Sequence, residues 1–236
     1  MDREEQIKRM KRQVGIEAAQ MVRDGDVVGL GTGSTAIFMI EELGRRIRDE
    51  RLSIAGIPTS YDAAVLARRY GIPVRTLDDV DGVDIAIDGA DEVDPAKQLI
   101  KGRGGAHLRE KIIDGLAKKF VVVVDESKMV SRLGTKCALP VEVLPLAIKP
   151  VTRRLEALNG VPELRMAIRK DGPVITDQGN MIIDVRFEAI DNPRELEQVI
   201  NNIPGVLENG LFVDLVSLVL VGHVTDEGSV TVECLT

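Results

Sequence analysis

Three apolar segments of this chain are each followed at once by polar side chains. The pairs are Val27–Leu30 with Gly31–Thr35, Val83–Ile87 with Asp88–Asp94, and Phe120–Val124 with Asp125–Lys128. Short apolar runs bounded by turn residues predict buried strands. In an open parallel sheet the carboxyl ends of the strands line one edge, so side chains far apart in sequence can surround one ligand there. The pattern therefore predicts an α/β sheet whose carboxyl edge carries the functional groups.

Helical periodicity separates these strands. Apolar residues recur at three- and four-residue steps from Ile7 to Met21, which predicts a helix over residues 4–24 that ends at Asp24-Gly25-Asp26. Alternating strands and helices imply parallel strands joined by right-handed crossovers. The aromatic content of only 3% fits, because Val, Ile, Leu and Ala fill buried parallel strands. The other elements expected here are helices after Thr35, at Tyr61–Tyr70 and at Ala106–Lys118, and strands at Leu52–Ile57 and Val74–Leu77.

The order of elements changes after Pro140. The expected elements are a strand at Val141–Leu144, a helix at Val151–Leu158, two strands around a hairpin turn at Gln178–Asn180, and a helix at Pro193–Asn202. This order is typical of a small α+β module. Leu215–Val221 again has the composition of a buried strand, and we expect it to rejoin the first sheet. The chain is therefore expected to form a Rossmann-like domain of residues 1–136 and 207–236 and an inserted α+β domain of residues 137–206.

Composition and charge exclude several classes of protein. A formal net charge of −7 argues against a nucleic-acid partner, since binding to the phosphate backbone favours a basic surface. No apolar run approaches the roughly 20 residues that cross a bilayer, and no signal-peptide core follows the charged amino terminus, so we expect a cytoplasmic protein without a membrane partner. Cys137 and Cys234 lack the spacing of a metal site, and we expect buried free thiols.

The loop after the first strand predicts a phosphate site. Gly31, Thr32, Gly33, Ser34 and Thr35 offer small residues, hydroxyls and backbone N–H groups where a helix begins, and a helix amino terminus favours an anion. The loop lacks the lysine of a Walker motif and the GxGxxG spacing of dinucleotide sites, which favours a smaller phosphate ester. The alternative is that Ser34 or Thr35 only caps the helix.

Four acidic residues follow the second strand within the segment Asp88-Gly89-Ala90-Asp91-Glu92-Val93-Asp94. Turn formation alone accounts for some of them. Metal binding is a rival interpretation, but the segment does not match a calcium loop and no histidine pair lies nearby. Carboxylates that bind sugar hydroxyls or act as acid and base explain the cluster at least as well.

A fourth segment, Lys101 to Glu110, pairs a cation with a carboxylate. The glycine-rich stretch Gly102-Arg103-Gly104-Gly105 lets a substrate approach the backbone, and Glu110 lies about one turn into the following helix. Removing a proton next to a carbonyl needs a base, together with positive charge or N–H dipoles for the developing enediolate. The alternatives are that Glu110 is one charge on a solvated helix, and that Lys128 is a surface lysine rather than a phosphate ligand.

The four motifs GTGSTA, DGADEVD, KGRGGAHLREK and DESK together resemble those of the type A ribose-5-phosphate isomerases, in order and in approximate spacing. The resemblance implies interconversion of ribose 5-phosphate and ribulose 5-phosphate through an enediolate, as in the non-oxidative pentose phosphate pathway. It implies no metal and no organic cofactor. It further implies a Rossmann-like domain, a ferredoxin-like α+β domain that helps to form oligomers, and a homodimer or homotetramer.

The resemblance also implies roles for individual residues. Glu110 matches the base that moves a proton between C1 and C2, and Lys101 matches the lysine that stabilises the oxyanion. Asp88 and Asp91 match the acidic pair that binds sugar hydroxyls and assists ring opening. The positions expected to contact substrate or phosphate are Lys11, Gly31, Thr32, Gly33, Ser34, Thr35, Asp88, Gly89, Ala90, Asp91, Lys101, Gly102, Arg103, Gly104, Gly105 and Lys128.

Other functions stay open at this point. An amino-sugar-phosphate deaminase/isomerase or a coenzyme A transferase-like protein could share the fold, and release of ammonia or formation of an acyl-enzyme would identify them. A sugar-phosphate sensor would keep the phosphate loop without needing the base. The Lys101 and Glu110 pair favours the isomerase.

Overall fold

The computed structural model describes residues 2–225 and 227–236. The chain divides into two compact units, and each passes through more than one segment of sequence. The first unit contains the residues up to Ala90 together with Arg109–Lys128 and Leu215–Thr236. The second unit contains Asp91–Leu108 and Met129–Asp214.

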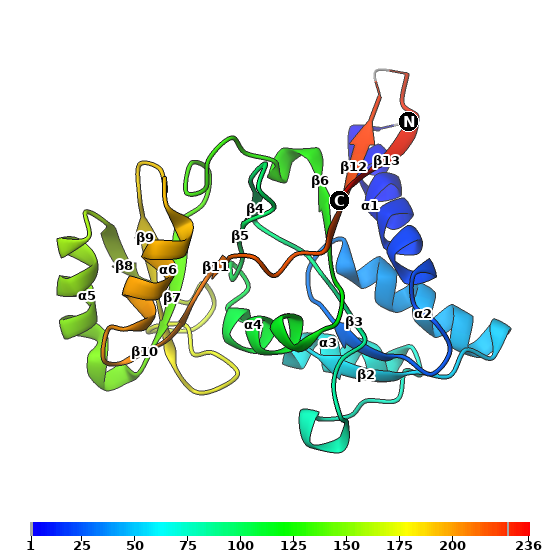
Figure 1. The fold of residues 1–236 in the computed structure, drawn as a ribbon, viewed down its shortest axis with the longest axis horizontal. Helices are drawn as coiled ribbons and strands as arrows, with labels where there is room; N and C mark the ends of the chain where they lie inside the picture. Colours follow the sequence, from blue (N-terminus) through cyan, green and yellow to red (C-terminus); the bar gives the residue numbers. More distant parts are fainter. Residues whose placement is uncertain (1, 226) are drawn as a thin grey trace. The chain divides into compact units, whose positions relative to one another are not determined.

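A six-stranded sheet forms the centre of the first unit (Figure 1), in the order β13-β12-β6-β3-β1-β2. All neighbouring strands are parallel except β13, which pairs antiparallel with β12. The prediction that Leu215–Val221 rejoins this sheet is confirmed, because β12 lies beside β6. The strands are β1 (Val27–Leu30), β2 (Ala55–Pro58), β3 (Ile85–Asp88), β6 (Phe120–Asp125), β12 (Leu218–Val224) and β13 (Val230–Leu235).

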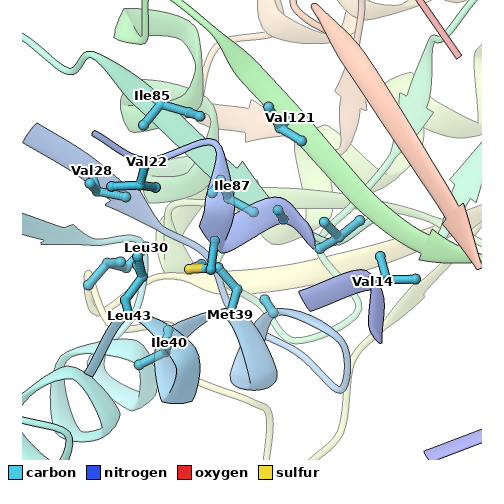
Figure 2. Close-up of a cluster of buried hydrophobic side chains, with 14 of the residues drawn as sticks. Val14, Val22, Val28, Leu30, Met39, Ile40, Leu43, Ile85, Ile87 and Val121 are labelled. Carbon is cyan, nitrogen blue, oxygen red and sulfur yellow. The ribbon is translucent and has the colours of Figure 1, made fainter. Parts of the chain in front are cut away.

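Helices cover both faces of this sheet, as predicted. Val28 and Leu30 point into a buried cluster with Met39 of α2 and Val14 of α1 (Figure 2). Gly29 faces the other way, where a Cβ atom would lie 3.0 Å from Ile113 Cγ2 of α4. The alternation of a strand thus sends successive residues to opposite helical layers. The helices are α1 (Arg3–Gln20), α2 (Ala36–Glu50), α3 (Tyr61–Arg69) and α4 (His107–Leu116).

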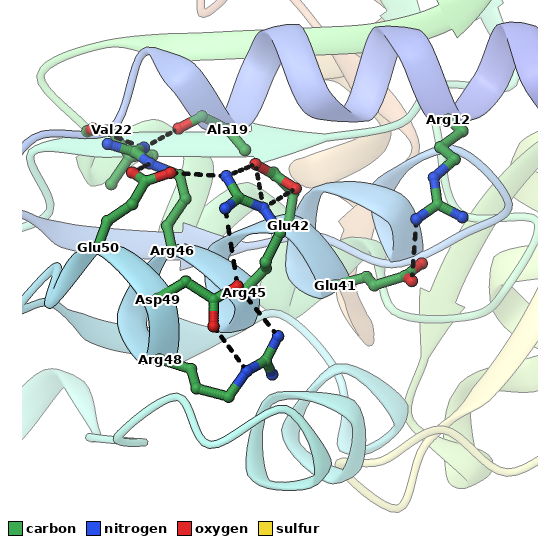
Figure 3. Close-up of polar contacts among 10 residues, drawn as sticks. All are labelled: Arg12, Ala19, Val22, Glu41, Glu42, Arg45, Arg46, Arg48, Asp49 and Glu50. Carbon is green, nitrogen blue, oxygen red and sulfur yellow. Dashed lines mark hydrogen bonds and ion pairs between the residues drawn. The ribbon is translucent and has the colours of Figure 1, made fainter.

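The first helix is shorter than predicted, because α1 ends at Gln20 rather than near Asp24. Arg46 of α2 donates hydrogen bonds to the carbonyl oxygens of Ala19 at 2.5 Å and Val22 at 3.0 Å, which satisfies backbone groups where α1 stops. The Arg46 guanidinium therefore supplies hydrogen-bond donors to carbonyl oxygens that a further helical turn would otherwise satisfy. Figure 3 shows this contact beside the charged outer face of α2, where Arg45 pairs with Glu42 and Glu50.

The second unit contains an antiparallel sheet in the order β10-β7-β9-β8. Val141 of β7 and Ile183 of β9 share a core with Val151 of α5 and Ile200 of α6, which gives the expected small α+β arrangement. A separate three-stranded sheet has the order β11-β5-β4. The elements are β4 (Glu92–Val93), β5 (Leu99–Ile100), β7 (Leu139–Val143), α5 (Ile148–Ala157), β8 (Val161–Leu164), β9 (Met181–Arg186), α6 (Pro193–Asn201), β10 (Val206–Asn209) and β11 (Leu211–Phe212).

Two predicted strands are corrected by the structure. Val74 forms only an isolated bridge with Gly56, and Leu77–Asp79 is a 3-10 helix, so Val74–Leu77 is not a strand. The turn at Gln178–Asn180 joins β9 to a segment with isolated bridges, such as Ile175 with Met181. The regular antiparallel partners of β9 are β7 and β8, which both lie earlier in the chain. A short apolar run in the sequence does not show whether it will form a continuous strand pair or only an isolated β-bridge.

The two units do not follow the expected domain limits. Residues 91–108, 129–136 and 207–214 belong to the second unit by their contacts, although they were assigned to the first domain. The division into a Rossmann-like domain of residues 1–136 and 207–236 and an α+β domain of residues 137–206 stays a prediction. The chain enters the second unit twice, which a linear reading of the sequence cannot reveal.

Both cysteines lie at positions less buried than expected. Cys137 is half-buried and Cys234 is exposed, so the prediction of two buried thiols is wrong. Neither is joined in a disulfide within residues 2–225 and 227–236. Over the same residues, no helix combines the length and the apolar composition that a bilayer crossing requires.

A buried carboxylate in the second unit gives stability a pH dependence. Glu142 lies on the face of β7 opposite the apolar core, and its Oε1 accepts hydrogen bonds from Thr176 Oγ1 at 2.7 Å and Asn180 Nδ2 at 2.9 Å. Burial raises the pKa of Glu142 above its ordinary value, and the two hydrogen bonds only oppose that shift. The folded state therefore holds the proton to a higher pH than the unfolded chain does.

We expect the Glu142→Gln variant to unfold at a higher urea concentration than the parent protein at pH 7. Because unfolding releases this proton, the contribution of Glu142 to stability falls as pH rises from the ordinary carboxyl range through the raised pKa. The neutral amide removes that dependence, so the difference between variant and parent should shrink as the pH is lowered. Glu163→Gln, at an exposed position of the same sheet, is the control. A difference that grows toward acid pH would contradict the assignment.

Candidate active site

The loop Gly31–Thr35 connects β1 to α2 at the carboxyl edge of the six-stranded sheet. Ser34 is exposed, and its Oγ accepts a hydrogen bond of 2.9 Å from Lys11 Nζ. Lys11 Nζ also lies 3.7 Å from Oδ2 of Asp125, the last residue of β6. Within the described residues, Thr35 at the N-cap of α2 accepts no side-chain capping bond. The alternative that these hydroxyls only cap the helix is therefore not supported, and α1, β6 and the loop itself all contribute polar groups to this edge.

Asp88 binds the backbone of the same loop through its carboxylate. It is the last residue of β3 and is fully buried, and its Oδ1 accepts hydrogen bonds from the backbone N–H groups of Thr32 at 3.0 Å and Gly89 at 2.7 Å. The Gly31 N–H donates to the Ile87 carbonyl oxygen at 3.0 Å. A Cβ atom at Gly31 would overlap the carboxyl group and Cα of Asp88. The contact between the loop and the acidic residue thus requires glycine.

We expect Gly31→Ala to lower stability by about 1–3 kcal/mol, because the added methyl group must displace Asp88 or the loop. Activity should fall as well, since both segments carry proposed site residues. The comparison is with Gly82→Ala in the same unit, because a Cβ at Gly82 meets nothing within 4 Å among the described atoms. Urea unfolding of the two variants measures the difference. Equal stability of both variants would show that the contact tolerates a side chain.

Glu110 lies at the same edge of the sheet as Asp88. Its neighbour Arg109 donates a hydrogen bond of 3.1 Å from Nη2 to the carbonyl oxygen of Pro58, the last residue of β2. One turn later, Ile113 packs against Gly29 of β1. The first turns of α4 are therefore held over the carboxyl ends of the parallel strands. Glu110 is only 6% exposed, so it is not one charge of a solvated helix face.

The second unit holds the remaining predicted residues, which include Asp91 and Lys101. The Arg103 N–H donates to Asp91 Oδ2 at 2.9 Å, and the Asp91 N–H donates to the Ile100 carbonyl oxygen at 2.8 Å. Lys101 is 2% exposed, its N–H donates to the Gly210 carbonyl oxygen at 2.9 Å, and its Nζ lies 5.4 Å from the centre of the Phe212 ring. Lys101 is thus a buried cation on a strand end and not a mobile surface lysine.

The acidic cluster contains two residues with a structural role that sequence reasoning did not assign. Glu92 is fully buried and accepts 2.6 Å hydrogen bonds from the N–H groups of Gly134, Lys136 and Cys137. Asp94 accepts from the N–H groups of Ala96 and Gln98 at 2.9 Å, as a turn carboxylate does. Four acids within seven residues marked the cluster, but no pattern in the sequence separates these two acids from Asp88 and Asp91.

The predicted site residues divide between the two units. Lys128 ends the 3-10 helix Glu126–Lys128 after β6 and is half-buried. Among residues 2–225 and 227–236, no group of three His, Cys, Asp or Glu side chains has the arrangement of a metal site. The first unit contains Lys11, Gly31, Thr32, Gly33, Ser34, Thr35, Asp88, Gly89, Ala90, Glu110 and Lys128; the second contains Asp91, Lys101, Gly102, Arg103, Gly104 and Gly105.

Comparison with known proteins gives a consistent result. The family model described as ribose 5-phosphate isomerase A (phosphoriboisomerase A) matches residues 55–226. The protein named ribose-5-phosphate isomerase A from Thermosynechococcus vestitus is 62% identical over 221 residues, which cover 93% of this chain and 94% of that protein. Its counterpart from Trichodesmium erythraeum is 61% identical over 216 residues, with 91% of each chain covered.

Solved structures agree with the sequence matches. Ribose 5-phosphate isomerase A from Methanocaldococcus jannaschii has a TM-score of 0.90 and 55% identity, and covers 96% of this chain and 97% of that one. A D-ribose-5-phosphate isomerase in complex with phospho-erythronic acid has a TM-score of 0.92 and 48% identity, and covers 100% of this chain and 99% of that one. By its motifs, fold and relatives, the chain belongs to the ribose 5-phosphate isomerase A family.

Proposed function

We propose that this protein interconverts D-ribose 5-phosphate and D-ribulose 5-phosphate through an enediolate intermediate, as part of the non-oxidative pentose phosphate pathway. The observation that carries the proposal is the placement of the buried Glu110 at the sheet edge that also holds Asp88 and the loop Gly31–Thr35. A base beside a phosphate loop suits a substrate with a reacting carbon at one end and a phosphate at the other.

The phosphate end of the substrate is assigned to the first unit. The loop supplies hydroxyl groups and a helix amino terminus, and Lys11 and Lys128 supply positive charge near the carboxyl end of β6. Thr32 Oγ1 lies 2.7 Å from Ser60 Oγ, so its hydroxyl already has a fixed partner within the sheet edge. Lys11 and Ser34 are the groups we expect to meet the phosphate oxygens.

Proton transfer is assigned to Glu110. In the open-chain aldose its carboxylate removes the proton from C2 and the electrons move onto O1. The proton of the O2 hydroxyl then passes to O1, and the same carboxyl group returns a proton to C1 as the C2=O bond forms. Lys101 and the N–H groups of Gly102 and Gly104 in the glycine-rich loop are assigned to the oxygens of the enediolate, where positive charge and N–H dipoles stabilise the developing anion. Asp88 and Asp91 are assigned to the sugar hydroxyls and to ring opening.

A relative with bound phospho-erythronic acid supports this assignment. That ligand carries a carboxylate and a phosphate at opposite ends of a four-carbon chain, so its carboxylate resembles the two neighbouring oxygens and the single negative charge of the enediolate. A site that binds both ends would bind the intermediate of the proposed reaction more tightly than the sugar itself.

We also propose a cytoplasmic protein that forms a homodimer or homotetramer.

The function is tested with ribose 5-phosphate in a coupled assay that contains EDTA. Formation of ribulose 5-phosphate under these conditions is the expected result, and it would establish the reaction and its independence of divalent metal together. Release of ammonia from an amino-sugar phosphate, or formation of an acyl-enzyme, would instead favour one of the fold relatives. Binding of the sugar phosphate without any turnover would favour a sensor.

Lys128→Ala is expected chiefly to raise KM for ribose 5-phosphate. A lysine that contacts the phosphate stabilises bound substrate and transition state alike, so its removal weakens binding and leaves kcat close to that of the parent. Steady-state kinetics of the variant measure both constants. Lys119→Ala, an exposed lysine of the same unit, serves as the comparison. An unchanged KM would remove Lys128 from the phosphate site.

A further inference from the structure

Arg165 links the small antiparallel sheet to the glycine-rich loop Lys101–Gly105 within the second unit. It follows β8, and its side chain is 16% exposed. Nη1 donates hydrogen bonds to two consecutive carbonyl oxygens of the loop, those of Gly102 at 3.1 Å and Arg103 at 3.0 Å. No feature of the sequence drew attention to this arginine.

Asp184 of β9 fixes the other side of the same guanidinium. Its Oδ2 accepts from Arg165 Nε at 2.7 Å, and its Oδ1 accepts from Nη2. The planar fork therefore forms a bidentate pair with the carboxylate and still has Nη1 directed at the loop. Asp184 lies in register with Glu163 of β8, so the carboxylate belongs to a regular strand pair and not to a loose turn.

The loop needs such a restraint because its own residues are flexible. Gly102 has φ +101° and Gly105 has φ +79°, conformations that glycine adopts without strain but does not hold by itself. Inside the loop the Gly105 N–H donates to the Gly102 carbonyl oxygen at 2.9 Å, and toward neighbouring segments the Lys101 N–H is bound to Gly210 and the Arg103 N–H to Asp91. Arg165 adds a second donor to the Gly102 carbonyl oxygen and ties the Arg103 carbonyl oxygen to the end of β8.

Holding a carbonyl oxygen also sets the direction of an N–H group. In a planar trans peptide the C=O of one residue and the N–H of the next point to opposite sides. The Arg103 carbonyl that Arg165 binds is part of the same peptide as the Gly104 N–H. The Gly102 carbonyl is likewise part of the same peptide as the Arg103 N–H, which donates to Asp91. Arg165 thereby orients two N–H groups of the loop away from itself.

We propose that Arg165, fixed by Asp184, is a positioning residue for the isomerisation. It holds the backbone of Gly102–Gly104 so that Lys101, Asp91 and the loop N–H groups keep the geometry that the enediolate requires. This inference rests on the proposed function. Arg165 itself makes no contact with the reacting atoms in this scheme; it acts through the loop. The competing interpretation is an ion pair that only stabilises the small sheet.

The test compares Arg165→Met, Arg165→Lys and the control Arg132→Met. Arg132 pairs with Asp191 at 3.0 Å in the same unit, but both side chains are largely exposed. We expect Arg165→Met to lower kcat by about 10- to 100-fold, since small displacements of positioned groups have effects of that size. KM should change little, because the assigned phosphate ligands belong to the first unit. Arg132→Met should match the parent.

The variants Arg165→Lys and Asp184→Asn test whether the Arg165–Asp184 pair positions the loop or only stabilises the sheet. A lysine ammonium can pair with Asp184 or with the loop carbonyls but lacks the fork that reaches both, so Arg165→Lys should recover only part of the lost kcat. Asp184→Asn should lower kcat in the same direction, and the double variant should be no slower than Arg165→Met, because the two residues act as one unit. Amide hydrogen exchange at residues 102–105 should become faster in each slow variant.

The outcomes distinguish the positioning role from the function on which it rests. If the parent protein does not turn over ribose 5-phosphate, the proposed function fails whatever the variants do. If the parent is active and folded Arg165→Met retains its kcat, the positioning role is overturned. A loss of kcat without faster exchange at residues 102–105 would also overturn it. Should Arg165→Met fail to fold, Asp184→Asn and Arg165→Lys are judged by the same two measurements.

Discussion

Replacing Glu110 by glutamine is expected to lower kcat by about 10²–10⁴-fold, the usual contribution of a general base. The amide keeps the size of the side chain but cannot accept the C2 proton. The position is 6% exposed at the carboxyl edge of the sheet, so no bulk water is expected to replace the lost base. KM for ribose 5-phosphate should stay near that of the parent, because the assigned phosphate contacts are unchanged.

A matched control separates the loss of a base from the loss of a charge. Glu156→Gln removes one glutamate from an exposed position of α5 and should keep parental kinetics. Far-UV circular dichroism and urea unfolding of Glu110→Gln should resemble those of the parent. A kcat within a few-fold of the parent would reject Glu110 as the base and would make Asp88 and Asp91 the candidates for that role.

Replacing Lys101 by methionine is expected to reduce kcat by about 10²–10³-fold, the size found when one donor to a developing oxyanion is removed. Methionine keeps the length and the apolar stem of the side chain, which packs near the Phe212 ring. Only the charge and its hydrogen bonds are lost. Because that charge acts on the enediolate more than on the neutral sugar, kcat should fall far more than KM rises.

The control for this variant is Lys149→Met, which removes an exposed lysine from α5 of the same unit. It should leave kcat, KM and the urea midpoint close to those of the parent. Loss of binding of phospho-erythronic acid by Lys101→Met would agree with a contact to the charged oxygens. Parental binding of that acid together with parental kcat would exclude Lys101 from the site.

The first unit could be predicted well because its residues encode it locally. Val27–Leu30 was predicted with the observed bounds of β1. Leu215–Val221 was correctly returned to the same sheet, although β12 begins and ends three residues later, at Leu218–Val224. Continuous apolar runs and helical periodicity act over a few residues, so they can be read from sequence. Val74–Leu77 failed because a run of four residues can form either a ladder or a single bridge.

The second unit was harder to predict because its contacts join distant segments. Glu92 binds N–H groups more than 40 residues later in the chain, and Arg165 binds carbonyl oxygens about 60 residues earlier. Such contacts leave no periodic signal. The motif KGRGGAHLREK marked the loop as functional, but only the folded chain shows which side chain holds its backbone. For the same reason the sequence does not show that residues 129–136 make their contacts within the second unit.

Deuterium exchange measured by NMR tests the central claim, that the Glu110 carboxylate carries the proton between C2 and C1. Ribose 5-phosphate is incubated in D₂O with the parent protein or with Glu110→Gln, and deuterium at C2 of the aldose and C1 of the ketose is followed. The account predicts that the parent introduces deuterium while it isomerises the sugar, and that the variant loses exchange and isomerisation together. Exchange at the parental rate in Glu110→Gln would contradict it, because another group would then be removing the proton.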